Sequence, residues 1–229
     1  MGRDACGDYL LPTRWDWNGI PEKGWHPHLD FGVSGLLYQS DVLMYDHHTE
    51  SVWSQMAMQA VTGKTLGQRL EPIFLEHTTW ATWRKDHHDT LVLSREKQFT
   101  RDYRRDPYEA YTQTDRLLFF PAKPDDRLSP KERVLGIEME RQYKASPFST
   151  LKEMGRTFSD SLHDQTYGVC WDAQGKSAKI VDQQEKPFPT LTAYWFAWYA
   201  FHPDTKIFMK DSGIAKPDMK ILDGVCEKL

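Results

Sequence analysis

Long apolar runs are missing from this 229-residue chain, and it carries only three cysteines. No uncharged apolar stretch reaches the about 20 residues that a membrane-spanning helix needs, and the first residues, MGRDACGDYL, lack the apolar segment of a secretory signal. We therefore expect no membrane span and no signal peptide in the sequence as given. Cys6, Cys170 and Cys226 form no Cys-x-x-Cys motif, and their number fits one disulfide as well as three free thiols.

An excess of positive charge is also lacking. Lys+Arg 29 and Asp+Glu 33 give a formal net charge of −4, whereas nucleic-acid binding needs concentrated Lys and Arg, so we expect no nucleic-acid partner. Gly32 and Gly35 are not followed by the helix and the lysine of a phosphate-binding loop. No Gly-x-Ser-x-Gly nucleophile occurs either. These absences favour a noncatalytic protein.

Aromatic residues, in contrast, are abundant, with Trp 9, Tyr 10 and Phe 11. Such side chains bury a large area each, so they build cores, line ligand clefts and form interfaces between proteins. A chain of this length forms one large domain or two small ones, and it buries a core without the help of a metal.

Short apolar segments bounded by turn residues predict strands over much of the chain. Residues 31–46 (FGVSGLLYQSDVLMYD) predict a hairpin with a turn after it at DHHTES. Residues 52–63 fit strand alternation and helical spacing in part, so strand and helix both stay open there. Single strands are predicted at residues 133–139, 168–173 and 177–182. The expected fold class is mainly β with a few short helices (α+β).

The frame Trp-x-x-Trp-x-x-x-His-x-Asp-Thr occurs twice, beginning at Trp80 and at Trp195. The two tryptophans and the histidine fall at i, i+3 and i+7, which predicts one buried face of a helix. Asp-Thr predicts a turn into a strand, at residues 90–94 in the first copy and 205–208 in the second. The helix predicted at residues 194–202 is aromatic on its other faces, so we expect it to be central or covered by a partner or a second copy.

This repeat predicts two related β-rich halves, each with a helix-then-strand unit. We assign residues 1–30, rich in Gly, Pro and Trp, to an irregular arm without regular structure. Residues 31–125 then form the first half and residues 126–229 the second, packed as one compact unit. The Pro-rich and Asp-rich residues 121–130 predict the loop between them.

The histidines of the repeat are weak candidates for catalysis. His87 with Asp89 and His202 with Asp204 resemble pairs in which an aspartate orients an imidazole base. The structural interpretation is favoured, because a histidine in the last turn of a helix interacts well with the negative helix end.

Other side chains suggest a metal site or a ligand site. His26 and His28 share a face if they lie in a strand, which suits zinc or copper, whereas His47 and His48 beside Asp46 point in opposite directions. Exposed loop histidines are the favoured interpretation, because neither group is a complete ligand set. In RDYRRDPYEAY, arginines interleaved with tyrosines fit an anionic or sugar ligand, although a solvated loop with internal ion pairs is favoured. The candidate ligand residues are Arg101, Tyr103, Arg104, Arg105 and Tyr108.

Several blocks together resemble a known prokaryotic family, the domain of unknown function 3179. The blocks appear in the expected order between about residues 31 and 208: FGVSGLLYQSDVLMYDHHTESVWSQ, TTWATWRKDHHDTLVLS, RDYRRDPYEAY, DRLSPKERVLGIE, YKASPFSTL and YWFAWYAFHPDTKIF. Family members commonly are exported, so the resemblance implies the periplasm or the cell exterior if the N-terminus is truncated. They usually carry a Thr-Tyr-Cys-Pro-x-Cys motif before these blocks. Residues 14–30 take its place here without such cysteines, so a metal or thiol role that this motif implies for the family does not carry over to this chain from the resemblance.

The function expected is that of a noncatalytic ligand-binding or assembly protein with an aromatic and Arg-rich surface. The alternative is a metal-handling protein or a metal-dependent enzyme that uses histidine and aspartate side chains with copper or zinc.

Overall fold

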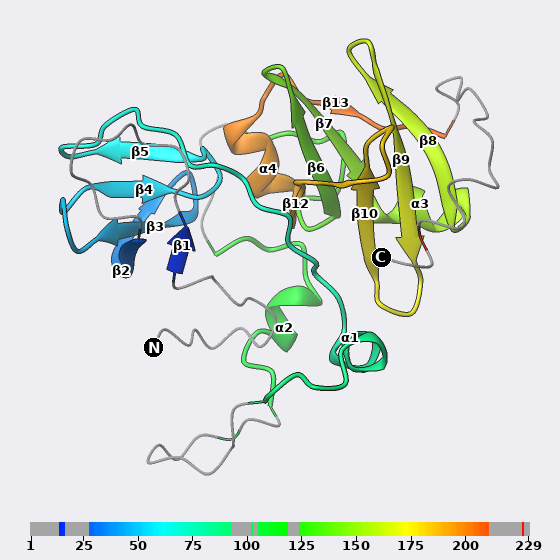
Figure 1. Cartoon of the computed structure of the whole chain (residues 1–229), viewed down its shortest axis with the longest axis horizontal. Coiled ribbons are helices and arrows are strands. Elements are labelled where there is room, and N and C mark those ends of the chain that lie inside the picture. Colours follow the sequence, from blue (N-terminus) through cyan, green and yellow to red (C-terminus); the bar gives the residue numbers. More distant parts are fainter. Residues whose placement is uncertain are drawn as a thin grey trace. The chain divides into compact units, whose positions relative to one another are not determined.

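The computed structural model describes residues 14–16, 28–92, 102, 105–118, 124–210 and 226, with only the backbone at residues 14–16 and 28–29. In these ranges thirteen strands form three sheets and four helices are short, as Figure 1 shows, so the expected β-rich class is confirmed. None of the helices in this part of the chain has the length and apolar character that crossing a bilayer requires.

The chain divides into two compact units that each combine separate stretches of sequence. Unit 1 contains residues 1–73, 107–127 and 196–203, and unit 2 contains residues 74–106, 128–195 and 204–229. The expected pair of related halves is not confirmed, and the predicted boundary between residues 125 and 126 stays a prediction.

Unit 1 is built on one antiparallel sheet, with the order β1-β2-β3-β4-β5. The hairpin predicted at residues 31–46 is confirmed, and its turn residues Gln39 and Ser40 have φ of 50° and 69°, as expected of a two-residue turn. Residues 52–63 form strands rather than a helix. The strands are β1 (Arg14–Asp16), β2 (His28–Tyr38), β3 (Asp41–Asp46), β4 (Val52–Ser54) and β5 (Gln59–Thr62).

One prediction about the N-terminal region was wrong. Residues 1–30 were expected to lack regular structure, yet Arg14–Asp16 pairs with residues 28–30 at the start of β2. The prediction failed because this three-residue strand is defined by its pairing with a distant segment rather than by its own composition.

One buried cluster of unit 1 consists of Trp53, Ala60 and Leu70, with Phe31 and Met58 packed against them. Phe31 and Trp53 meet edge to face at 6.0 Å between ring centroids. The short helix α2 (Glu109–Thr112) also belongs to this unit.

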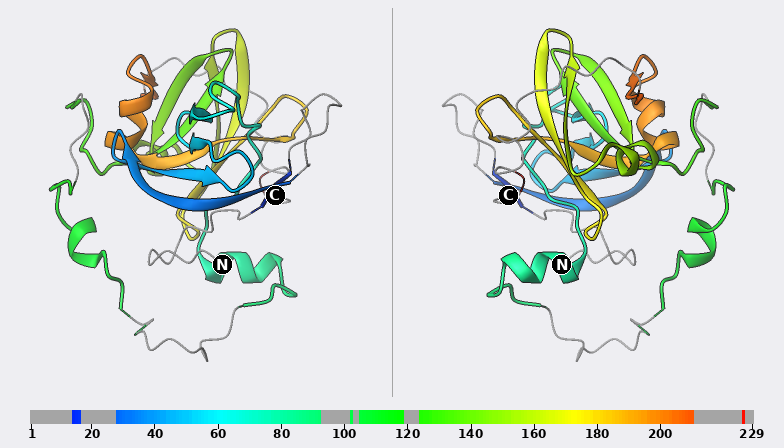
Figure 2. Two further views of the ribbon diagram at one scale, coloured as in Figure 1. Left: turned by 90° about the vertical axis from the view of Figure 1, so that its left-hand side faces the viewer. Right: turned by 90° about the vertical axis from the view of Figure 1, so that its right-hand side faces the viewer.

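Unit 2 contains two four-stranded sheets, with the orders β12-β6-β7-β13 and β11-β10-β9-β8. Figure 2 shows their strands from two further sides. The strands predicted at residues 133–139, 168–173 and 177–182 are confirmed. Strand β13 pairs with β7 in parallel. The first sheet consists of β6 (Arg133–Met139), β7 (Gln142–Pro147), β12 (Leu191–Tyr194) and β13 (Lys206–Ile207). The second consists of β8 (Thr157–Leu162), β9 (Gln165–Asp172), β10 (Ser177–Val181) and β11 (Pro187–Phe188).

The core of unit 2 draws on both sheets and on helix α3 (Phe148–Met154). Phe158 and Phe208 stack at 5.2 Å, and Phe148 meets Trp171 edge to face at 5.2 Å. Because alternate side chains of a strand point to opposite faces, Leu135 and Ile137 of β6 face this core together with alternate residues of β8 and β9.

The two predicted Trp helices both exist, as α1 (Trp80–Asp86) and α4 (Trp195–Phe201), but they differ in burial. Trp195 and Trp198 are buried as predicted, whereas Trp80 is 48% exposed and α1 has no buried residue. A strand follows α4 as β13, whereas residues 90–92 after α1 form none. The predictions of a buried face and of a following strand were therefore wrong for the first copy, because helical spacing does not specify what packs against a helix.

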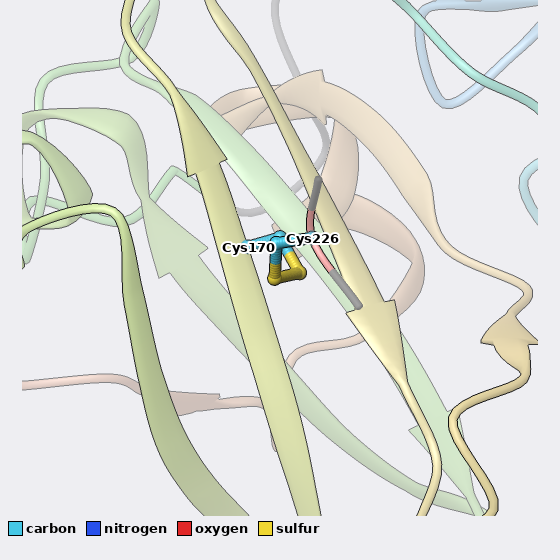
Figure 3. Close-up of a disulfide and its surroundings, with 2 residues drawn as sticks. All are labelled: Cys170 and Cys226. Atoms are coloured by element: carbon cyan, nitrogen blue, oxygen red, sulfur yellow. A yellow bond between two sulfur atoms is a disulfide. The ribbon is translucent and has the colours of Figure 1, made fainter. Parts of the chain in front are cut away.

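A disulfide joins Cys170 and Cys226, with 5.7 Å between their Cα atoms (Figure 3). Tyr167, Val169 and Trp171 of β9 point into the core, so Cys170 points to the other face of the strand. One disulfide was one of the two alternatives left open by the sequence, and its presence is consistent with an oxidising compartment.

Candidate functional site

His87 belongs to the end of helix α1. Its ring stacks on that of Trp83 at 3.7 Å and 3°, and its backbone N–H donates to the Trp83 carbonyl at 3.0 Å. Thr79 caps the start of the helix by accepting a hydrogen bond from the Thr82 N–H, and the Trp83 indole N–H donates to Thr90 Oγ1 at 2.9 Å. His87 and Asp89 are both exposed. These contacts support the structural interpretation, and catalysis by this pair stays a prediction.

His202 ends helix α4 in the same way but in a buried position. Its backbone N–H donates to the Trp198 carbonyl at 3.0 Å, and the two rings lie 4.2 Å apart. Burial lowers the pKa of His202 to about 4, so the imidazole is neutral at physiological pH. Asp204 is exposed. His202 belongs to unit 1 and His87 to unit 2, and a cleft shared by the two pairs stays a prediction.

The candidate metal ligands are only partly described. His26 lies outside the described residues, and His28 is the first residue of β2, with only its backbone described. His47 and His48 lie exposed in the turn after β3. Within the described ranges, no group of three or more His, Cys, Asp or Glu side chains converges on one point.

Asp46, which lies beside these histidines, is a buried structural residue. Its carboxylate accepts hydrogen bonds from Trp53 Nε1 at 2.8 Å, from Thr49 Oγ1 at 2.6 Å and from the His48 N–H at 3.1 Å. Burial alone would raise the pKa of Asp46, but these hydrogen bonds outweigh burial and lower it. The carboxylate therefore fixes the turn and the Trp53 indole in unit 1.

The proposed Arg and Tyr ligand residues are largely outside the described part of the chain. This holds for Arg101, Tyr103 and Arg104. Arg105 and Tyr108 are exposed, and Tyr108 immediately precedes α2. A ligand surface formed by these residues stays a prediction.

The β2–β3 hairpin carries a cluster of exposed apolar side chains that the sequence analysis did not identify as a site. We name it the hairpin surface. Leu37 and Val42 lie directly opposite each other on the two strands, whereas the register shifts between Val33 and Leu37. Gly35, with φ of 73°, lies in this irregular stretch, and the consecutive side chains of Leu36 and Leu37 are both exposed. The surface consists of Val33, Leu36, Leu37, Tyr38 and Val42.

This surface was missed because an apolar run in a strand is normally interpreted as core. The sequence feature that could have indicated it is an uncharged apolar strand that contains a glycine, since FGVSGLLY has no ionisable side chain before Tyr38. Tyr38 also contacts α4 within unit 1, where its ring meets that of Phe201 edge to face at 5.6 Å.

A buried polar cluster in unit 2 was also not predicted from the sequence. Lys144 Nζ of β7 donates to Asp160 Oδ1 of β8 at 2.6 Å, and Tyr167 Oη of β9 donates to Asp160 Oδ2 at 2.8 Å. Ser146 lies on the same face of β7 as Lys144, and its buried Oγ has no hydrogen-bond partner among the described residues. The available signal was the series Phe158-x-Asp160-x-Leu162, in which a charged residue occupies an inward position of an alternating strand.

Residues 76–79, which precede α1, are attached to unit 2 by polar contacts. Glu76 pairs with Lys179 at 2.9 Å, and Arg133 Nη2 lies 2.6 Å from His77 Nδ1. The Arg133 guanidinium also lies 4.6 Å above the ring of Phe148. These contacts account for the charged residues of this segment structurally.

Comparison with known proteins supports the resemblance found in the sequence blocks. Neither a curated protein nor a solved structure matches this chain. A family model does match residues 20–187, which is more than half of the 229 residues. The chain therefore belongs to the family described as "Protein of unknown function (DUF3179)".

Proposed function

We propose that this chain is a noncatalytic assembly protein that self-associates through the hairpin surface. The observation that carries the proposal is the exposure of five apolar side chains on one hairpin, from 44% at Leu37 and Tyr38 to 68% at Val33. Contiguous apolar patches on a protein surface mark contact sites, and on this hairpin Leu37 and Val42 lie side by side on one face, whereas isolated exposed apolar residues are ordinary.

The backbone of β2 supports the same proposal. In the part of the chain that the structure describes, β3 pairs along one side of β2, whereas β1 pairs on the other side only at residues 28–30. Along residues 31–38 the described part of the chain therefore offers a strand edge, on which the Leu36 N–H donates to Ser34 Oγ at 3.1 Å. Proteins usually protect such edges with Lys, Pro, a β-bulge or a very short strand, and of these devices the segment has only the irregular stretch between Val33 and Leu37.

A second copy of this chain is the occupant that fits this edge. Two antiparallel β2 strands related by a two-fold axis would satisfy each other's donors and acceptors, because both copies offer the same segment. Residues 31–38 carry no like charges that would repel across such a pair. Each half-exposed apolar side chain contributes about 1 kcal/mol on burial. The ten side chains of the two copies then contribute about 10 kcal/mol. Since association itself costs at least about 4 kcal/mol, we expect a dissociation constant on the order of tens of micromolar.

Helix α4, the contact surface expected from the sequence, has less support. Its two tryptophans are already buried within the chain, and the Tyr199 ring lies 5.2 Å from the Arg127 guanidinium. The apolar area left for a partner on this helix is therefore smaller than on the hairpin.

Sedimentation velocity over a concentration series tests the proposal. We expect the wild-type chain to dimerise and Leu37→Lys to stay monomeric, because a lysine at this position places a charge on the paired edge. Leu91→Lys is the matched control, since Leu91 is 96% exposed and lies in unit 2, and it should dimerise like the wild type. A wild-type chain that stays monomeric up to about 100 μM would overturn the proposal.

A further inference from the structure

Lys144 and Asp160 bring an amine and a carboxylate into contact inside unit 2. They come from different sheets, since β7 belongs to one and β8 to the other. The Nζ–Oδ1 distance is 2.6 Å, and the side chains are only 9% and 6% exposed. An ion pair so deeply buried is costly, because both charges give up their hydration.

The surroundings hold the two groups in a fixed orientation. Lys144 Nζ also donates to the Ser161 carbonyl at 3.0 Å and lies 5.5 Å from the Phe208 ring centroid. Asp160 Oδ1 accepts from the Ser161 N–H at 2.8 Å, and Oδ2 accepts from the Tyr167 hydroxyl. Burial and the charge of Asp160 raise the pKa of Tyr167, so its hydroxyl keeps the proton that it donates.

We propose that Lys144 and Asp160 condense into an intramolecular amide bond that cross-links β7 to β8. Lys144 first transfers a proton to Asp160 Oδ1, which leaves an amine with a free lone pair and a carboxylic acid whose hydroxyl group can leave as water. Nζ then attacks Cγ. The Nζ–Cγ bond forms, the Cγ–Oδ1 bond breaks, and Oδ1 leaves as one water with two hydrogens from the original ammonium group. The reaction needs no oxidant, reductant or other co-reactant.

Each of these contacts has a role in this step. The 2.6 Å contact gives the two groups a high effective concentration. Tyr167 Oη donates to Oδ2, the oxygen that becomes negative in the tetrahedral intermediate and remains as the amide oxygen. The Ser161 carbonyl accepts a hydrogen bond from Lys144 Nζ and so orients the Nζ lone pair for attack. Exclusion of water from this position favours condensation over hydrolysis.

Mass spectrometry of the denatured, intact chain tests the proposal. We expect a mass lower than the sequence mass by one water, in addition to the two hydrogens lost to the disulfide. After reduction and trypsin digestion, we expect no cleavage after Lys144 and a branched peptide in which residues 142–152 are joined to residues 157–176. Lys179 is the internal control. It pairs with Glu76 at 2.9 Å, but both side chains are more exposed to water, so trypsin should cleave after it.

Two variants separate the cross-link from an ordinary ion pair. Lys144→Arg keeps the positive charge without a nucleophilic amine, so its mass should lack the loss of water. Tyr167→Phe should condense more slowly, and the uncondensed fraction should decrease during incubation. A folded wild-type chain that loses only two hydrogens and is cleaved after Lys144 would overturn the proposal, whether or not the variants fold.

Discussion

Two buried ionisable side chains in unit 1 give the protein opposite responses to pH. His202 has a pKa of about 4 because burial disfavours the imidazolium. Burial also raises the pKa of Asp41 to about 6, although the backbone N–H groups of Val42 and Met56 donate to its carboxylate and partly oppose the shift. On acidification, His202 therefore destabilises the folded state, whereas Asp41 stabilises it, and single substitutions are needed to separate the two effects.

The first prediction concerns His202→Gln. The folded-state pKa of His202 lies below its ordinary value of 6.5, so its contribution to stability is present above pH 6.5 and is lost as the pH falls toward 4. Relative to His202→Gln, the wild type should therefore lose about 2 kcal/mol between pH 7 and pH 5, as measured by urea unfolding. His163→Gln, at an exposed turn, is the control and should follow the wild type. A constant difference between wild type and His202→Gln across this range would contradict the buried, neutral imidazole.

Asp41→Asn should stabilise the protein, but only where Asp41 is ionised. The folded-state pKa of Asp41 is raised, so the cost of its buried charge is absent below pH 3.8 and develops as the pH rises through 6. The stability of Asp41→Asn relative to the wild type should therefore increase by about 3 kcal/mol between pH 4 and pH 7. Asp164→Asn is the control, because this side chain is 95% exposed. If the two variants show the same pH dependence, Asp41 is not desolvated.

At the scale of elements, the repeated Trp helices show that one sequence pattern serves two structural roles. Both copies keep the frame and a Trp–His ring contact at the helix end, stacked with centroids 3.7 Å apart in α1 and tilted by 49° with centroids 4.2 Å apart in α4. Only α4 buries its tryptophans. Helix spacing therefore determines the local geometry, whereas tertiary contacts determine which helix contributes to a core.

A matched pair of truncations measures this difference. Trp195→Ala should lower the free energy of unfolding by about 4 kcal/mol, because it leaves a large cavity. Trp80→Ala should lower it by about 0.5 kcal/mol, because the side chain is already half-exposed. Urea unfolding followed by circular dichroism compares the two variants without relying on tryptophan fluorescence. Equal losses would show that α1 buries its Trp face as α4 does.

The elements that could be predicted from the sequence are those fixed by local pattern. Strand β6 matches its predicted bounds at residues 133–139, and the turn at residues 39–40 follows from turn-forming residues between apolar runs. The strand β1 and the missing strand after α1 could not be predicted, because strand pairing depends on distant partners. The hairpin surface was hidden for a related reason, since an apolar strand has the same pattern whether it faces a core or water. The contact between Lys144 and Asp160 depends on the packing of two sheets, which no local pattern encodes.

At the scale of the whole molecule, each unit has its own core and its own means of stabilisation. In unit 1 the Asp46 network fixes Trp53, which belongs to an apolar cluster. In unit 2 the Cys170–Cys226 disulfide, with a sequence separation of 56 residues, adds about 4 kcal/mol by restricting the unfolded chain. The hairpin surface lies in unit 1, so pairing with a second copy would bury apolar side chains of this unit.

Amide hydrogen exchange of β2 at two protein concentrations tests the proposed self-association most directly. If β2 pairs with β2 of a second copy, the amides of residues 33–38 should exchange more slowly in concentrated than in dilute protein, and Leu37→Lys should remove this dependence on concentration. Residues 134–136 of β6, which pair with β12 on one side and with β7 on the other, provide the internal reference and should exchange at the same rate in both samples. Concentration-independent exchange of residues 33–38 in the folded wild type would contradict assembly through the hairpin surface.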